Sequence, residues 1–344
     1  MVAKVRIGGR RARWGRLLWR LAVLLGAGLA VAHLALTRPP KAHPAAPPRQ
    51  ELVWQVRPLG SLSQPLEGAA AAVMDGRVLL AGGLTAADVS SAELTFFALR
   101  PWRSVATYRL PRAVHDAAMA VVGGRAYLLG GGDAVGPVAS VWAISPDGIV
   151  RGATALPVPL SDLAAVASGG RIYVFGGFTG RSYSRAVWDW RPGGTWRRVG
   201  TLPYGLRYSA AAVMDSRVYL FGGLTSAGRT ADILSFDPAT GRVRRVGALS
   251  RPLMYAGAAS SNGQLLVVGG KGVHGFRTAI RRFQPTTGKL TMVGRLPLPL
   301  GYFAVAGTTL LGGRTDAGPV AQIYQMMPSK QGAAPGKTKA KAGR

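Results

Sequence analysis

The chain has 344 residues, with 43 Lys and Arg against 14 Asp and Glu, and carries a formal net charge of +29. Apolar residues make up 48% of it, which excludes a chain that is disordered throughout. It contains no cysteine, which excludes disulfide frameworks, cysteine-based zinc sites and thiol nucleophiles. With 48 glycines and 23 prolines, the sequence predicts frequent turns and no long uninterrupted helix outside one segment near the N-terminus.

The positive charge is concentrated at the two ends of the chain. Residues 1–20 hold seven basic residues and no acid, and residues 1–49 and 329–344 together hold 15 of the 43 basic residues. The middle of the chain therefore has 28 basic and 14 acidic residues, a net charge of +14. One interpretation of this excess is a coding bias toward arginine or the avoidance of labile amides in a thermophile. The functional interpretation is attraction to an anionic surface such as lipid headgroups or an acidic glycan.

An apolar segment near the N-terminus predicts a membrane anchor. Leu21–Thr37 has 17 residues without Asp, Glu, Lys or Arg, just enough to cross a bilayer as a helix. The basic residues before it place the N-terminus in the cytoplasm and the rest of the chain outside. We expect a basic cytoplasmic region at 1–16, a transmembrane signal-anchor helix at 17–37 and a stiff Pro-rich linker at 38–50.

A cleaved signal peptide is the alternative interpretation of this segment. The apolar run ends in Ala30-Val31-Ala32, which has the small-x-small form of a cleavage site and would release a secreted protein. Both interpretations export the domain, so nucleic acid is not an expected partner.

A double glycine at the end of a β-rich run recurs six times along the rest of the chain, at intervals of 48, 46, 46, 47 and 43 residues. Each pair follows a run of small residues and precedes a polar loop and then a strand with an aromatic side chain. Four short strands per repeat form a small sheet that cannot bury both faces alone, so the sheets are expected to pack around an axis. The glycine pairs end at Gly83, Gly131, Gly177, Gly223, Gly270 and Gly313.

These repeats resemble the Kelch-repeat family of β-propellers, in its bacterial, exported or membrane-anchored form. The resemblance rests on the double glycine, the downstream aromatic, the repeat length and the Leu-Pro before several inner strands, and it covers residues 51–328. It implies an all-β, six-bladed Kelch-type propeller preceded by the one N-terminal helix. The chain departs from the family pattern in the fourth strand, whose Trp is present as Trp102 and Trp196 but missing from several repeats.

The ring is predicted to close with strands from both ends of the repeat region. The last repeat reaches Ala321–Tyr324 and then lacks a fourth strand before the basic tail at 329–344, which we expect to be disordered. An unassigned segment, Leu52–Val56, precedes the first repeat. We therefore expect residues 52–59 to complete the last blade, which removes an exposed sheet edge.

The residues that lead into the inner strands are predicted to surround one mouth of the propeller. Aligning the repeats places there the pairs Glu67-Gly68, His115-Asp116, Ser161-Asp162, Arg207-Tyr208, Met254-Tyr255 and Gly301-Tyr302. Kelch domains bind ligands through Arg, Tyr and Ser at this mouth, which implies such roles for matching residues here. The predicted ligand-binding residues are Ser161, Arg207, Tyr208, Tyr255, Tyr302, His115 and Asp162, with Arg181 and Arg277 from nearby loops. For the three tyrosines, which share one register, packing between blades is the alternative.

The leading functional hypothesis is a membrane-anchored extracytoplasmic binding module whose mouth holds a protein loop or an acidic saccharide. The alternative is a sugar-modifying enzyme resembling the sialic-acid mutarotases built on Kelch propellers. Its candidate acid–base residues are His115, Asp116, Asp162 and Glu67. No cofactor is expected, and no metal site, because the only histidines of the repeat region, His115 and His274, belong to different repeats. The family's copper oxidases use a Tyr crosslinked to Cys, which this chain lacks.

Overall fold

The computed structural model describes residues 52–330, which form an all-β architecture without a helix. The regions predicted at 1–16, 17–37 and 38–50, and most of the tail predicted at 329–344, lie outside the described residues. No helix in the described range is long and apolar enough to cross a membrane.

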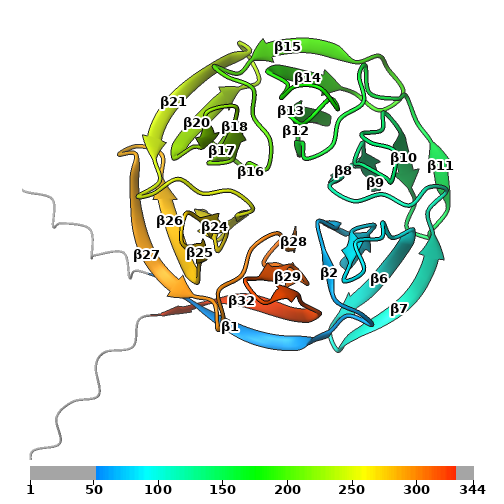
Figure 1. The fold of residues 1–344 in the computed structure, drawn as a ribbon, viewed down its shortest axis with the longest axis horizontal. Coiled ribbons are helices and arrows are strands. Elements are labelled where there is room, and N and C mark those ends of the chain that lie inside the picture. The colour runs from blue at the N-terminus through cyan, green and yellow to red at the C-terminus, as the bar shows by residue number, and fades with distance from the viewer. Residues whose placement is uncertain (1–51, 331–344) are drawn as a thin grey trace, which may run out of the picture. The chain divides into compact units, whose positions relative to one another are not determined.

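The strands form small antiparallel sheets that are arranged in a ring, as in a β-propeller (Figure 1). Among residues 52–330, four of these sheets have four strands each and one sheet has eight. The eight-stranded sheet consists of two four-stranded halves, which meet where Trp54 of β1 pairs with Gly294 of β27. We call each four-stranded sheet, and each half of the larger sheet, a blade.

Each blade runs from a short inner strand to an outer strand at the rim (Figure 1). The strands, from the inside outward, are β3 (Ala70–Met74), β4 (Arg77–Ala81), β6 (Glu93–Leu99) and β7 (Trp102–Arg109); β8 (Ala118–Val122), β9 (Arg125–Leu129), β10 (Val141–Ile144) and β11 (Val150–Gly152); β12 (Ala164–Ser168), β13 (Arg171–Phe175), β14 (Ala186–Trp190) and β15 (Arg197–Thr201); β16 (Ala210–Met214), β17 (Arg217–Phe221), β20 (Asp232–Asp237) and β21 (Arg242–Ala248); β22 (Gly257–Ser261), β23 (Gln264–Val268), β26 (Ala279–Gln284) and β27 (Lys289–Arg295); β28 (Ala304–Ala306), β29 (Thr309–Leu311), β32 (Gln322–Lys330) and β1 (Leu52–Ser61).

Short two-residue strands form small two-stranded antiparallel sheets at one end of several blades. They are β2 (Leu66–Glu67), β5 (Leu84–Thr85), β18 (Leu224–Thr225), β19 (Gly228–Arg229), β24 (Lys271–Gly272), β25 (Gly275–Phe276), β30 (Arg314–Thr315) and β31 (Gly318–Pro319).

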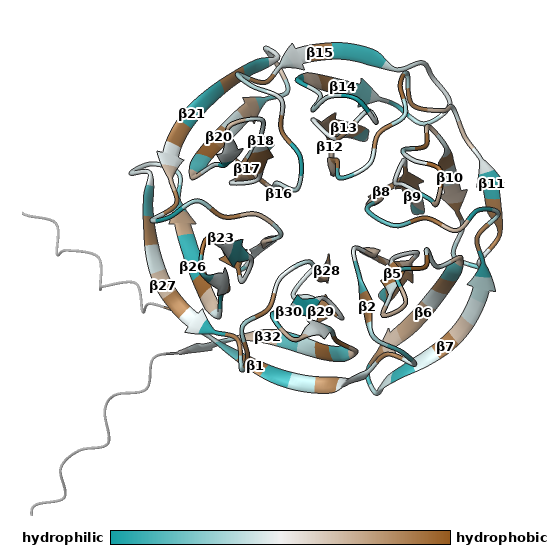
Figure 2. Cartoon of the chain, in the orientation of Figure 1, coloured by the Kyte–Doolittle hydropathy of each residue, from teal (hydrophilic) through white to brown (hydrophobic). Residues whose placement is uncertain are grey.

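The hydrophobic side chains lie between the blades, and the outer strands are polar. Figure 2 shows long hydrophilic stretches on outer strands such as β7, β15, β21 and β27. Aromatic residues of the inner and middle strands meet across neighbouring blades: the ring centroids of Phe175 and Phe236 are 5.3 Å apart, and those of Phe221 and Phe283 are 5.6 Å apart. The innermost strands instead carry mostly Ala, Val and other small residues, because the blades converge there.

The double glycines join each blade to the next one. The N–H of Gly83 donates to the carbonyl oxygen of Val114 at 2.8 Å, and the last pair returns to the first blade, where the N–H of Gly313 donates to Leu66 at 2.7 Å. The first glycine of a pair lies against the same carbonyl, so that a Cβ on Gly82 would approach the Val114 oxygen to less than 3.0 Å. This backbone contact between blades therefore requires glycine.

The two ends of the described chain close the ring. β1 and β32 pair in antiparallel register from Leu52↔Lys330 to Ser61↔Gln322, and Trp54 of β1 is only 2% exposed. The segment predicted at residues 52–59 thus lies at the outer edge of the last blade. β32 continues to Lys330, two residues past the predicted end of the propeller at residue 328.

Gly170 and Gly176 provide a matched test of the contact between blades. Both have positive φ, +70° and +62°, but a Cβ on Gly170 meets nothing within 4 Å, whereas one on Gly176 overlaps the Leu206 carbonyl. We expect Gly170→Ala to lower the free energy of unfolding by about 1 kcal/mol, through backbone strain alone. We expect Gly176→Ala to lower it by about 3 kcal/mol or more, because it also separates two blades. Urea unfolding measures both losses, and equal losses would contradict this role of the glycine pair.

Candidate functional site

A closed circle of backbone hydrogen bonds surrounds the axis at one face of the ring. Each member donates its N–H to the carbonyl oxygen of the equivalent residue in the preceding blade, with N···O distances of 2.8–3.4 Å. The circle closes because the N–H of Gly68 donates to Tyr302 at 3.0 Å. We call this circle the axial belt; within the described residues its members are Gly68, Asp116, Asp162, Tyr208, Tyr255 and Tyr302.

All belt members share one unusual backbone conformation, with φ between +54° and +59°. This left-handed region favours glycine, and a residue with a Cβ there is strained by about 1–2 kcal/mol. Tyrosine is an uncommon choice in this conformation. The belt hydrogen bonds and the packing of the blades hold these residues in it.

The loops that follow the double glycines lie at the same face as the belt. The residue before a belt member bridges to the residue after the glycine pair, as in His115↔Gly132 and Arg207↔Leu224. We call these loops the mouth loops; they span residues 84–90, 132–137, 178–183, 224–229, 271–276 and 314–319. This is the mouth that the sequence alignment predicts.

The belt encloses a shallow depression of about 150 Å³, lined by the belt members and the residue after each of them. Three tyrosines fill much of the axis, with ring centroids 4.4 Å apart for Tyr208 and Tyr255 and 4.2 Å apart for Tyr255 and Tyr302. The three tyrosines come from three neighbouring blades and pack against one another, which agrees with the packing alternative, and they also line the depression.

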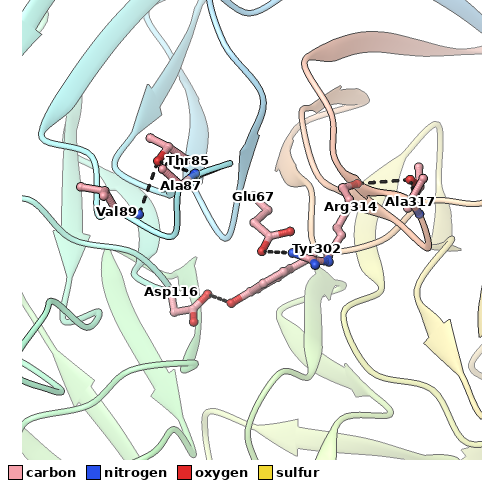
Figure 3. A network of polar contacts seen from close by, with 10 residues as sticks. Glu67, Thr85, Ala87, Val89, Asp116, Tyr302, Arg314 and Ala317 are labelled. Atoms are coloured by element: carbon pink, nitrogen blue, oxygen red, sulfur yellow. Dashed lines mark hydrogen bonds and ion pairs between the residues drawn. The ribbon is translucent and has the colours of Figure 1, made fainter.

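Asp116 lies on the floor of the depression and is 8% exposed. The hydroxyl of Tyr302 donates to its Oδ1 (Figure 3). A Cβ on Gly68 would lie 2.5 Å from the same Oδ1, so the glycine leaves room for this contact. Burial, and then the negative charge of Asp162 and a hydrogen bond between the two carboxyl groups, raise the pKa of Asp116 well above its ordinary value of 3.8. Asp116 therefore keeps its proton to a higher pH than an ordinary aspartate does.

Arg207 balances the charge of Asp162. Its Nη2 lies 2.6 Å from Asp162 Oδ2, and its guanidinium also donates to the Tyr208 hydroxyl. Although burial disfavours the charge of Arg207, Asp162 and Tyr208 raise its pKa. The guanidinium also lies over the rings of Phe178 and Tyr208, 4.8 Å and 4.3 Å from their centroids. The charge of Arg207 is thus largely compensated within the protein, and the hydroxyl of Ser161 donates to the same Asp162 Oδ2 at 3.1 Å.

Glu67 and His115 lie beside the depression and do not line it. Glu67 is 4% exposed and pairs with Arg314 at 2.8 Å (Figure 3), and burial raises the pKa of its carboxyl group. The Nδ1 of His115 lies 2.9 Å from the hydroxyl of Ser90, and burial lowers the pKa of the imidazole.

Two predicted ligand residues lie away from the depression. Arg181 is exposed in its mouth loop, and Arg277 packs over Gly272 just after the mouth loop 271–276. Neither lines the depression.

Three exposed valines on the mouth loops were missed by the sequence analysis. Val89, Val135 and Val273 are 59%, 93% and 68% exposed. The sequence signal for these residues is an apolar side chain in a polar loop that follows a double glycine.

The described residues do not form a metal centre. Between residues 52 and 330, no group of three or more His, Cys, Asp or Glu side chains is placed to hold a metal ion. The polar side chains that line the depression are carboxyl, phenol and hydroxyl groups, which can form hydrogen bonds.

Comparison with known proteins identifies the repeat. The model of the Kelch motif matches residues 159–203 and 205–250. The solved structure titled "Structure of YjhT" superposes with a TM-score of 0.67 at 16% sequence identity, over 78% of this chain and 99% of that chain. At this identity the likeness shows the fold alone. No curated protein matches the chain in sequence.

The raised pKa of Asp116 predicts how stability depends on pH. Between pH 3.8 and the raised pKa, the unfolded chain releases a proton that the folded protein keeps. The free energy of unfolding therefore falls as the pH rises, by up to about 1.4 kcal/mol per pH unit. Because Asp116→Asn removes this titration, we expect its stability relative to wild type to increase with pH, measured by urea unfolding from pH 4 to 8.5.

Asp133→Asn is the control for this measurement. Despite partial burial, the pKa of Asp133 is lowered by the N–H groups of Val135 and Gly136 and by Arg112. Its contribution to stability is present above about pH 4 and lost only below it, so the stability of Asp133→Asn relative to wild type should not change between pH 4 and 8.5. An equally flat profile for Asp116→Asn would mean that Asp116 is ionised in the folded protein.

Proposed function

We propose that this chain, which belongs to the Kelch-repeat family, is a six-bladed propeller that acts as a binding module through its mouth face. Six axial-belt residues, one per blade, support the blade count within residues 52–330. The two halves of the eight-stranded sheet count as separate blades, because a single residue pair joins them and each has its own inner strand.

The proposal of a binding module rests on the small volume of the depression and on the pairing of its polar side chains with one another. Sites that enclose a small molecule typically have volumes of about 300–1,000 Å³, whereas the depression measures about 150 Å³. Its polar groups are already paired with one another, as in Arg207–Asp162 and Tyr302–Asp116. A ligand therefore gains most by spreading over the mouth loops around the depression.

The mouth loops favour a protein ligand. Val89, Val135 and Val273 expose apolar side chains at this face, and an apolar contact surface suits a protein loop better than a sugar. An acidic saccharide held by cationic loop residues such as Arg181 and Lys271 is the alternative ligand.

The amino-terminal sequence supports a membrane-anchored form of this module. Residues 17–37 would span the membrane, with the N-terminus in the cytoplasm and the propeller outside. A protein secreted after cleavage of the segment is the alternative.

Asp116 favours a second candidate function, a sugar-modifying enzyme that transfers protons. A buried carboxyl group with a raised pKa is suited to act as a general acid, and Asp162 lies beside it. Their hydrogen bond does not fit a glycosidase, which separates its two carboxyl groups by about 5 Å or more. For this candidate we expect sugar turnover that disappears in Asp116→Asn and Asp162→Asn, measured by NMR of the anomeric protons.

The binding proposal is tested by changing the mouth loops and not the depression, because Arg207→Ala would leave Asp162 buried without its partner and destabilise the fold. Peptides that bind the wild-type protein are first selected from a display library. We expect the double variant Val135→Asp with Val273→Asp to bind these peptides at least about tenfold more weakly, equivalent to about 1.4 kcal/mol. The control is Val105→Asp, at a valine 38% exposed on the outer strand β7.

Each result of this experiment bears on one ligand class. Peptide binding that is unchanged by the loop variants would contradict the mouth as a protein-binding face. If acidic sugars on a glycan array bind instead, and Arg181→Ala removes that binding, the saccharide alternative is correct.

A further inference from the structure

The blade formed by β22, β23, β26 and β27 carries only positive charge. Between Gly257 and Arg295 the sequence has six Lys and Arg and no Asp or Glu. The acid-free stretch extends further, from residue 238 to residue 315, and contains eleven basic residues. This is a local imbalance, because the other blades combine arginines with carboxylates.

Three arginines gather on one side of this blade. Ala279 of β26 pairs with Arg295 of β27, so these two side chains point to the same side. Arg281 lies two residues after Ala279, and Arg277 two residues before it, just ahead of the strand. Side chains of a strand alternate, which places Arg281 on that side as well. The bulge after Ile280 does not disturb this alternation, because the extra residue is Val293 of β27.

That side of the blade faces the neighbouring blade with β20 and β21 (Figure 1). Phe283 follows Arg281 on the same side of β26. Its ring centroid lies 5.6 Å from that of Phe221 and 5.8 Å from that of Tyr219, both on β17 of the neighbouring blade. Arg281 is half-buried on the same side of β26 as Phe283, which faces the neighbouring blade.

The three arginines do not form an ion pair with any carboxylate among the described residues. The acids of the facing strand β20 have other partners: Asp232 pairs with Arg245 at 2.5 Å, and Asp237 with Arg217 at 3.1 Å. Burial, and then the charges of Arg277 and Arg295, lower the pKa of Arg281. A half-buried cation beside two like charges is unfavourable unless an anion joins it.

We propose that Arg277, Arg281 and Arg295 form an oxyanion site on this side of the blade, which takes a phosphate or sulfate group of a ligand. Three guanidinium groups match a divalent tetrahedral anion better than a single carboxylate, and each provides N–H donors in a planar fork. The site is distinct from the axial depression, where Asp162 already compensates Arg207. It does not depend on the proposed function of the mouth.

The test compares the melting temperature of the full chain in sodium phosphate, sulfate, acetate and chloride at one ionic strength. We expect phosphate and sulfate to raise it in a saturable way, as a ligand that binds only the folded protein does, and acetate and chloride not to. Arg281→Gln should abolish this rise. It should also raise the melting temperature in chloride, because it removes the repulsion among the arginines.

Two further variants complete the test. Arg295→Gln, at an exposed position, should weaken the apparent affinity for sulfate at least tenfold without affecting folding. Arg244→Gln, exposed on the outer strand β21 of the neighbouring blade, should leave the affinity unchanged. Glycerol phosphate and glucose 6-sulfate then show which kind of ester is preferred.

Three results would overturn the proposal. The first is equal stabilisation by phosphate, sulfate and chloride. The second is a sulfate effect that persists in both Arg281→Gln and Arg295→Gln. The third is an equal loss of the effect in Arg244→Gln, which would indicate diffuse screening of the whole basic surface.

Discussion

The hydrogen bond from the second glycine of each pair to a carbonyl of the next blade is the contact on which the structure depends. Its acceptors include Leu66, Val114 and Leu206, and each acceptor lies two residues before a member of the axial belt. The same bond therefore joins two blades and sets the position of one belt residue. A Cβ on the first glycine would push the acceptor away, and the belt residue with it. Fold and candidate site thus share a single constraint.

The belt repeats its backbone around the axis but not its side chains. Each position has the same left-handed conformation, yet the side chains are one glycine, two aspartates and three tyrosines. This broken symmetry allows contacts across the axis that identical residues would prevent. The clearest case is Gly68, whose missing side chain leaves the space in which Tyr302 reaches Asp116. The need to join the blades explains why the backbone conformation repeats. A functional site, in contrast, requires side chains that differ from blade to blade.

The periodic parts of the structure could be predicted from the sequence, and contacts across the axis could not. Repeat alignment predicts the strands and places Asp116, Asp162 and the three tyrosines at one mouth, because equivalent residues occupy equivalent positions. It also places Arg207 next to that mouth, but not its pairing with Asp162, which depends on side-chain direction. Arg181 and Arg277 were assigned to the mouth because of the loops nearby, and alignment does not specify where such side chains point. The segment at 17–37 lies outside the described residues.

The arginines of this domain serve two different electrostatic roles. At the mouth, Arg207 and Arg314 each meet a buried carboxylate, and these pairs neutralise the charge that burial would otherwise penalise. On the side of β26 that faces the neighbouring blade, Arg281 is also half-buried, but the charges that act on it most are those of other arginines. A folded chain gains nothing from such repulsion by itself. The net charge of the domain is therefore not only a property of its composition, because part of it is placed where only an external anion can compensate it.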